Sequence, residues 1–153
     1  PTNHQTLGWG VVGQFHDYPD GLSSPVISWG WGPLTNGDTS SGYWWLTQTP
    51  QATPGDYSLG NIALLKLPLN VGVWQDIMMQ IRFKSDATGT VKCWLNGAPQ
   101  TFLTGGTTFT GQTMITTVPG IHYQLGYYRQ AGIAPTGIVS YTGLRIADSQ
   151  ASL

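Results

Sequence analysis

The segment 11–17, VVGQFHD, places a glutamine and a histidine two positions apart among residues that favour β-strands. Alternate side chains of a strand point to the same face, so Gln14 and His16 would lie side by side. Both side chains exchange hydrogen bonds, and histidine also transfers protons near neutral pH. The pair could therefore belong to an active site, contact a bound sugar, or be two polar residues on a solvated strand.

Few other residues show a recognisable catalytic pattern. The remaining histidines are His4, close to the first residue, and His122. No G-x-S-x-G elbow supports a Ser-His-Asp triad, and Asp17 and Asp20 flank a Tyr-Pro turn, where aspartate is a common turn residue. The sequence contains no glutamate, which excludes glycosidases that use a glutamate pair.

Metal-binding patterns are also missing from the sequence. The single cysteine, Cys93, permits no internal disulfide, and no CxxC or Cys/His cluster suggests zinc. No group of aspartates has the spacing of a calcium loop. We therefore expect no metal and no cofactor, and we expect Cys93 at a buried strand position.

The seven tryptophans offer large apolar rings. Trp29 and Trp31 alternate on one predicted strand, whereas Trp44 and Trp45 are adjacent, so one of that second pair must point away from the other. Exposed rings stack on the apolar faces of sugars, but a small sandwich also needs large side chains in its core. Both interpretations stay open for Trp29, Trp31 and Trp45. Two further tryptophans are expected in the core: Trp74 and Trp94.

Length and charge narrow the classes of protein and partner. The chain has 153 residues, which suits one domain with a core and is too short for two comfortable ones. Charged residues make up 8% of it, against roughly 25% in a typical domain, and the net charge is −1. Nucleic acids and anionic lipids bind clustered lysines and arginines, so neither is expected as a partner. No apolar run approaches the roughly 20 residues of a membrane span, so membrane insertion is not expected.

The predicted elements are all strands. Twenty-one glycines, ten prolines and short β-rich runs are typical of an all-β sandwich or barrel. Ile77, Met79 and Ile81 alternate with mostly polar residues, which indicates an antiparallel sheet with one face in the core. Asn96-Gly97 suits a tight hairpin turn. The predicted strands span residues 7–16, 26–31, 43–48, 63–67, 76–84, 90–95, 100–103, 114–117, 122–129 and 138–146.

Four segments, in order, resemble polysaccharide lyases of the heparin-lyase and glucuronan-lyase type. The segments are VVGQFHD, LPLNVGVWQDIMMQIRFKSDATGTVKCWLNG, HYQLGYYR and VSYTGLRIADS, and the resemblance spans most of residues 9–148. Such lyases are concanavalin-like β-jelly rolls. The resemblance therefore implies that residues 1–153 form a single antiparallel β-sandwich of this type. Because the chain begins with Pro1, we interpret it as a processed product or a part of a larger protein.

The resemblance also implies β-elimination on a uronic-acid polysaccharide. This reaction neutralises the sugar carboxylate, removes the proton from C5 with a base and protonates the leaving oxygen. On the family's Gln-x-His strand, Gln14 would neutralise the carboxylate and His16 would be the base. Both side chains would lie in the groove of the jelly roll, on the same face of the strand.

The family's Tyr-x-Lys-x-Gly-x-Tyr-Arg motif is only half matched. Tyr128 and Arg129 stand at its last two positions, whereas His122 and Gln124 replace the first tyrosine and the lysine. Tyr123 is adjacent but would face the opposite side of the strand. The candidate catalytic residues are Gln14, His16, His122 and Tyr128, and the candidate substrate-binding residues are Trp29, Trp31, Trp45, Gln124, Arg129 and Arg82.

Three functions stay open from the sequence. The first is a carbohydrate-binding module with a lyase-like jelly roll, favoured by the low charge, the tryptophans and the altered motif. The second is an active lyase, and the third is a structural sandwich whose aromatic residues form an interface with other subunits of a larger assembly. The expected partner is a polysaccharide or cell-surface glycan, and the expected location is extracellular, either secreted or on a virion as in a phage tail.

Overall fold

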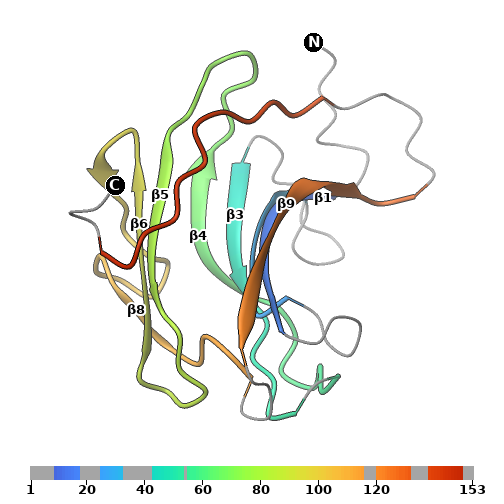
Figure 1. Ribbon diagram of the computed structural model, residues 1–153, viewed down its shortest axis with the longest axis vertical. Helices are drawn as coiled ribbons and strands as arrows, with labels where there is room; N and C mark the ends of the chain where they lie inside the picture. The colour runs from blue at the N-terminus through green and yellow to red at the C-terminus, as the bar shows by residue number, and fades with distance from the viewer. Residues whose placement is uncertain are drawn as a thin grey trace.

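The computed structural model describes residues 9–17, 25–32, 43–53, 55–115, 120–131 and 138–149. Within these ranges nine strands form two antiparallel sheets, and no helix is present. The two sheets are the layers of a sandwich (Figure 1). The predicted all-β fold, an antiparallel β-sandwich of the jelly-roll class, is confirmed.

The first sheet brings distant parts of the chain together. Its strands are β1 (Gly10–Asp17), β2 (Ile27–Trp31), β3 (Tyr43–Gln48), β4 (Ile62–Pro68) and β9 (Ile121–Arg129). They are arranged in the order β4-β3-β2-β1-β9. β1 and β9 come from opposite ends of the described chain, yet they are hydrogen-bonded neighbours (Figure 1). The two strands that contain all four candidate catalytic residues therefore lie side by side.

The second sheet is a smaller meander. It contains β5 (Ile77–Arg82), β6 (Gly89–Leu95), β7 (Ala98–Pro99) and β8 (Phe109–Gly111), and β6 pairs with the other three. Asn96 and Gly97 form the turn between β6 and β7 with φ angles of 51° and 79°. Positive φ at both central positions is what a tight hairpin requires, so the predicted turn is confirmed.

The core fills the space between the sheets. The first sheet contributes Trp29, Leu46 and Leu65, and the second contributes Val91 and Cys93. Cys93 is 1% exposed, as expected, and burial raises the pKa of its thiol to about 12. The apolar side of β5 also packs against this core, which confirms the alternation of Ile77, Met79 and Ile81.

Three predicted strands are wrong. Residues 100–103 form no strand, and the short β7 precedes them; residues 138–146 are not in a strand either. The described part of the predicted strand 114–117 is also irregular, and β8 lies outside all of the predicted strands. Phe102 and Ile115 are nonetheless buried, at 2% and 0% exposed. Loops also contribute apolar side chains to the core, and a short apolar pattern therefore does not require a strand.

The tryptophans considered for sugar stacking are not on the surface. Trp29, Trp31 and Trp45 are 5%, 8% and 6% exposed. Trp29 and Trp31 project from β2 into the core cluster, where the ring of Trp44 lies 6.0 Å from that of Trp29. Of the two interpretations left open, the structure favours the core for Trp29 and Trp31, because their side of β2 faces the second sheet; Trp45 of β3 is also buried.

Candidate functional site

The pairing of β1 with β9 sets four polar side chains next to one another. Gln14 lies opposite Gln124, and His16 lies opposite His122. Directly opposed residues of an antiparallel pair project to the same side of the sheet. These four residues, called here the Gln/His cluster, include three of the four candidate catalytic residues. Their convergence follows from the register of two strands that are about a hundred residues apart in sequence.

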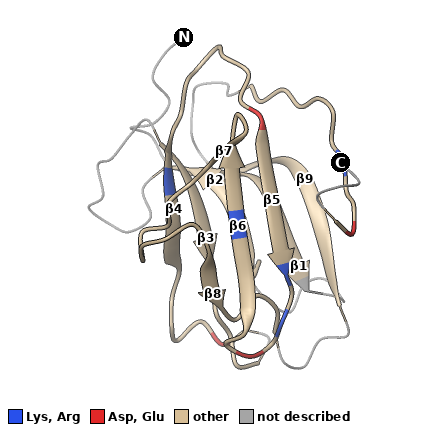
Figure 2. Ribbon diagram, turned by 90° about the vertical axis from the view of Figure 1, so that its left-hand side faces the viewer, with Lys and Arg blue, Asp and Glu red and all other residues tan. Residues whose placement is uncertain are grey.

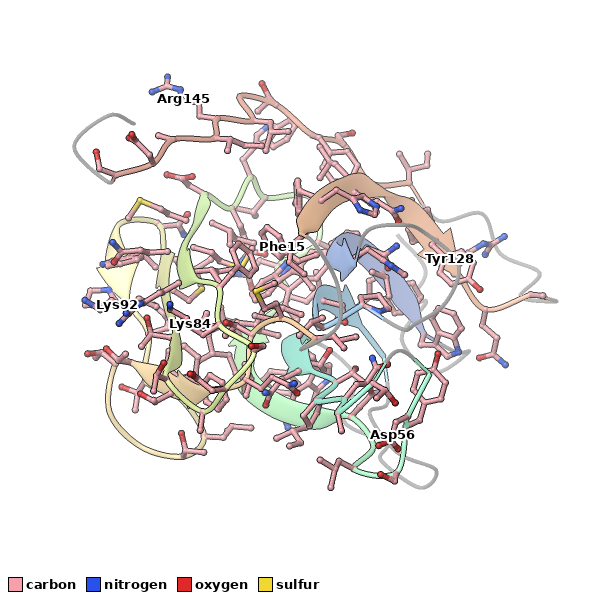
Figure 3. The ribbon with its side chains drawn as sticks, turned by 60° about the horizontal axis from the view of Figure 1, so that its bottom comes forward. Phe15, Asp56, Lys84, Lys92, Tyr128 and Arg145 are labelled. Atoms are coloured by element: carbon pink, nitrogen blue, oxygen red, sulfur yellow. The ribbon has the colours of Figure 1, made fainter. Side chains whose placement is uncertain are left out.

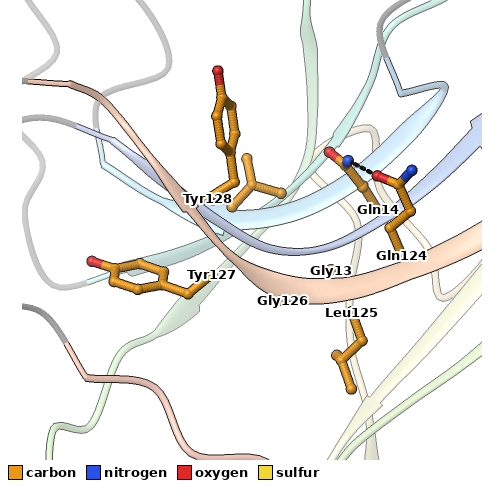
Figure 4. Close-up of a pocket in the computed structure, with 8 residues that line it drawn as sticks. Gly13, Gln14, Gln124, Leu125, Gly126, Tyr127 and Tyr128 are labelled. Atoms are coloured by element: carbon orange, nitrogen blue, oxygen red, sulfur yellow. Dashed lines mark hydrogen bonds between the residues drawn. The ribbon is translucent and has the colours of Figure 1, made fainter. Parts of the chain in front are cut away.

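Hydrogen bonds and ring stacking link the members of the Gln/His cluster. Gln14 donates a hydrogen bond from Nε2 to Oε1 of Gln124, marked by the dashed line in Figure 4. The Nε2 atoms of Gln124 and His122 are 2.9 Å apart, and because an amide nitrogen can only donate, the histidine nitrogen accepts. The rings of His16 and His122 stack with centroids 5.8 Å apart and an interplanar angle of 28°.

The residues between the cluster members show which way the cluster faces. Phe15 and Tyr123 alternate with it and lie opposite each other, with ring centroids 4.8 Å apart. Phe15 packs against the core and lies 5.4 Å from Phe83 of the segment that follows β5. The Gln/His cluster therefore projects from the outer face of the first sheet, away from the second sheet. Tyr123 lies on the inner side, as the sequence predicts, and burial raises the pKa of its hydroxyl.

A β-bulge shapes the strands beside the cluster. The register of β1 and β9 shifts just before Gly13, where an added Cβ would lie 2.5 Å from the hydroxyl oxygen of Tyr123. The hydroxyl of Tyr141 lies 3.1 Å from the carbonyl oxygen of Val12 and 2.7 Å from that of Gly126. A side chain from the C-terminal segment therefore bridges the two strands at the bulge. Burial also raises the pKa of Tyr141.

A depression of about 230 Å³ lies over this bulge. Its lining includes Gln14 and Gln124 of the cluster together with Tyr128, and Figure 4 shows these three side chains on the same side of the strands. Tyr128 is 64% exposed, and its ring is tilted against that of Trp9 at a centroid distance of 5.2 Å. The depression thus has a primary amide pair and a phenol at its border, with the stacked imidazoles along the same strands. Such groups can hold a carboxylate and move protons.

The outer face continues across the sheet as an uncharged polar row. Ser28 of β2 lies opposite Gln14, and Thr47 of β3 lies opposite Ser28. The hydroxyl oxygens of Ser28 and Thr47 are 2.6 Å apart. Thr47 is buried, so the amides and the hydroxyl of Ser28 are the groups of this row that can exchange hydrogen bonds with a sugar.

Two arginines expected at the site lie elsewhere. Arg82 belongs to β5 of the second sheet, opposite Thr90, so its predicted position near the cluster is wrong. Sequence alone does not reveal which of the two sheets the strand of Arg82 joins. Arg129 lies at the end of β9 opposite Gly10, and alternation turns it away from the side of Tyr128.

No pattern in the sequence indicates the surroundings of two residues, Lys66 and Trp74. Lys66 of β4 projects over the rings of Tyr43 and Trp45, with Nζ 4.1 Å and 4.9 Å from their centroids. Trp74 is 66% exposed, so its predicted place in the core is wrong; it lies in the segment before β5 and not in a strand that packs between the sheets. Lys66 appears in sequence as one cation in an apolar strand, so only the strand pairing identifies its neighbours.

The described residues contain no group of three histidine, cysteine or aspartate side chains that could hold a metal ion. The described part of the chain also contains no helix with the length and apolar character needed to cross a membrane.

Comparison with known proteins identifies the family of the chain. A family model described as polysaccharide lyase matches residues 1–145, which is nearly the whole chain. No curated protein and no solved structure matches the sequence. The match includes β1, β9 and every residue of the Gln/His cluster. The chain is thus a member of the polysaccharide lyase family.

Proposed function

We propose that this protein cleaves a uronic-acid polysaccharide by β-elimination on the outer face of its first sheet. The observation that supports this most strongly is the convergence of Gln14, His16 and His122 beside a depression that Tyr128 borders. Membership of the polysaccharide lyase family implies a polysaccharide as substrate or partner. Geometry and family therefore favour the same reaction class.

In the proposed reaction Gln14 binds the sugar carboxylate. A primary amide has two N–H groups, and Gln124 accepts a hydrogen bond from one of them. That bond fixes the plane of the Gln14 amide, so the other N–H can donate a hydrogen bond to a carboxylate in the depression. A hydrogen bond to a charged group contributes about 1.5–3 kcal/mol, and it lowers the negative charge that opposes removal of the C5 proton.

His16 and Tyr128 are assigned the two proton transfers. His16 takes the proton from C5, the electron pair left on C5 forms the C4=C5 double bond, and the bond between C4 and the bridging oxygen breaks. Tyr128 gives its proton to that leaving oxygen. The products are a chain with a new reducing end and a chain that begins with an unsaturated uronate.

His122 and Gln124 are assigned as positioning residues. Gln124 accepts from Gln14 and donates to His122, so it links the carboxylate-binding amide to the histidine pair. His122 also stacks on His16, which restricts the orientation of the proposed base. In this proposal the residues that replace the family's tyrosine and lysine support the reacting groups and do not act as the acid.

Within the family, we assign the chain to the heparin-lyase and glucuronan-lyase type. The Gln-x-His strand and the altered motif at residues 122–129 support this assignment. Polysaccharides with uronic acids are found outside cells, so we propose an extracellular location, either secreted or on a virion.

Binding without cleavage is the second candidate function. It is favoured by the composition of the Gln/His cluster, which contains no lysine, arginine or carboxylate where the lyase motif has a lysine. A groove of neutral amides and imidazoles can hold a glycan through hydrogen bonds. The buried positions of Trp29 and Trp31 remove the stacking surfaces that first suggested a binding module.

The two candidates are separated by an absorbance assay. The full chain is incubated with alginate, glucuronan, heparin and hyaluronan, and the ultraviolet absorbance of the new unsaturated uronate is followed. We expect turnover of at least one substrate, and we expect His16→Ala to lower kcat by about 10²–10⁴-fold, as is typical for loss of a general base. Gln80→Ala is the matched control, because Gln80 is an exposed glutamine of the second sheet.

The chain could bind a glycan and yet produce no rise in absorbance on any of the four substrates. That result would support the binding function and exclude the lyase proposal for these polysaccharides. Turnover that is unchanged in His16→Ala would contradict the assigned base.

A further inference from the structure

The positive charges of this chain are unevenly placed. All six lysines and arginines lie in the described ranges: Lys66, Arg82, Lys84, Lys92, Arg129 and Arg145. In Figure 2 the basic residue of β4 stands apart from those of β5 and β6. Figure 3 shows Lys84 and Lys92 on the opposite side of the molecule from Tyr128, with Arg145 at a third position. Only Lys66 belongs to a strand position on the outer face of the first sheet.

Strand pairing establishes the orientation of Lys66. It lies opposite Trp45, and the neighbours of Trp45 on β3, Trp44 and Leu46, both contact the core. Side chains alternate along a strand, so Trp45 and its partner Lys66 project to the outer face. Lys66 therefore lies on the same face of the sheet as Gln14, on the edge strand β4, three strands away from β1.

The surroundings of Lys66 are aromatic. Its Nζ lies 4.1 Å from the ring centroid of Tyr43 and 4.9 Å from that of Trp45. Among the described residues no carboxylate forms an ion pair with Lys66, so cation–π contacts are what hold the ammonium in place. The ring of Tyr43 is 37% exposed, and the buried indole N–H of Trp45 has no acceptor in the described part of the chain. This cluster thus combines a cation with an accessible aromatic ring.

A continuous row of residues connects this cluster with the depression. Lys66 lies opposite Trp45, Trp45 opposite Gly30, Gly30 opposite Val11, and Val11 opposite Tyr128. The row crosses all five strands, which corresponds to about 19 Å at a strand spacing of about 4.8 Å. Large side chains lie at both ends of the row, and Gly30 near its middle has none. An extended sugar chain could therefore contact both ends at once.

We propose that Lys66 and Tyr43 form a second subsite, which binds an anionic group, a carboxylate or a sulfate, on a sugar several residues away from the cleaved bond. This inference rests on the proposed function, because it assumes that the glycan lies across the outer face. Lys66 provides the charge, and Tyr43 provides a ring on which the same or the next sugar stacks. Because the subsite is three strands away from β1, it contributes equally to binding of the substrate and of the transition state.

The test compares Lys66→Met, Lys66→Arg and the matched control Lys92→Met. Lys92 is an exposed lysine on β6 of the second sheet. Retardation of the full chain is measured by electrophoresis in gels that contain alginate, glucuronan, hyaluronan or heparin, with dextran as the uncharged polymer. The first three probes present carboxylates alone, and heparin adds sulfates.

Lys66→Met is expected to lower the affinity for the polyanion that retards the unaltered chain by about fivefold. Its retardation should also depend less on the salt concentration. Lys66→Arg and Lys92→Met should behave like the unaltered chain. In the absorbance assay, Lys66→Met should raise KM while kcat stays the same. A loss confined to heparin would assign the subsite to sulfate, and a loss on the other gels would assign it to carboxylate.

Equal retardation of Lys66→Met and the unaltered chain at every salt concentration would overturn this inference, and so would a lack of retardation by all four polyanions. Failure of the subsite and failure of the proposed lyase reaction give different results in these two assays. A chain that is retarded through Lys66 but produces no unsaturated uronate would retain the subsite and lose the lyase assignment.

Discussion

At the scale of single residues, the important question is which atom of the Gln14 amide faces the sugar. Oxygen and nitrogen of a free amide can exchange positions by rotation, and only the nitrogen can donate to a carboxylate. Gln124 removes this ambiguity, because its Oε1 accepts from the nitrogen of Gln14. His122 fixes Gln124 in turn by accepting from its amide nitrogen. A short chain of hydrogen bonds therefore sets the polarity of the proposed carboxylate contact.

Gln124→Ala should therefore impair catalysis through Gln14. The variant loses the acceptor for the Gln14 amide, and loss of about 1 kcal/mol in the transition state corresponds to a fall in kcat of about fivefold. Steady-state kinetics on the cleaved uronate measures this, with Gln80→Ala as the control. Unchanged kcat in a folded Gln124→Ala protein would show that Gln14 needs no positioning partner.

The side of the sheet to which an aromatic residue projects is not visible at this scale from the sequence. Trp29 and Trp45 are both buried, yet Trp29 belongs to the core between the sheets and Trp45 lies on the outer face next to Lys66. The Gln-x-His spacing, in contrast, is a local property of one strand, and it correctly predicts a shared face for Gln14 and His16.

At the scale of elements, the bulge between β1 and β9 determines the shape of the depression. Gly13 leaves room for the hydroxyl of Tyr123 on the inner side. The C-terminal segment contacts the bulge through the hydroxyl of Tyr141, which lies near the backbone carbonyls of Val12 and Gly126. The sequence does not predict this arrangement, because residues 138–146 resemble a strand and their contact with the bulge depends on the whole fold.

Gly13→Ala should destabilise the protein by about 1–3 kcal/mol, because its Cβ would overlap the Tyr123 hydroxyl. The double variant Gly13→Ala with Tyr123→Phe removes the overlapping oxygen and should recover most of that loss. Urea unfolding followed by tryptophan fluorescence provides the free energies of unfolding. Gly126→Ala is the matched control in β9, because its Cβ would meet no atom within 4 Å. Equal stabilities of Gly13→Ala and Gly126→Ala would contradict the close packing described for Gly13.

Tyr141→Phe should lower the free energy of unfolding by about 1 kcal/mol, since it removes the hydroxyl that bridges the two strands. Thermal unfolding is compared with that of Tyr57→Phe, in which the tyrosine is 50% exposed. If the two variants unfold at the same temperature, the hydroxyl of Tyr141 makes no net contribution to the bulge.

At the scale of the whole molecule, most of the few basic residues lie away from the outer face of the first sheet. Arg82, Lys84 and Lys92 belong to the second sheet or its turns, while the outer face of the first sheet presents amides, imidazoles and Lys66. Composition alone correctly indicates a charge-poor all-β protein. It does not indicate where the few charges lie, because strand order and register determine that placement.

The burial of two tyrosine hydroxyls makes the free energy of unfolding depend on pH in the alkaline range. Burial raises the pKa of Tyr123 and of Tyr141 above the ordinary value of 10. The folded protein therefore holds these two protons to a higher pH than the unfolded chain does, so the free energy of unfolding falls as the pH rises through about 10.

Urea unfolding between about pH 8 and pH 11 should show this decline, and Tyr123→Phe should make it shallower. A free energy of unfolding that stays constant or increases over that range would contradict the burial of these hydroxyls.

The most direct test of the central claim is the mass of the products formed from a defined uronate oligosaccharide. β-Elimination yields a fragment with a C4=C5 double bond, which is one water molecule lighter than the corresponding hydrolysis product. We predict that the full chain forms this unsaturated fragment and that Gln14→Ala and His16→Ala, each folded, form little or none. Fragments that all contain the added water, or unsaturated fragments in equal amounts from both variants, would contradict the proposed lyase mechanism.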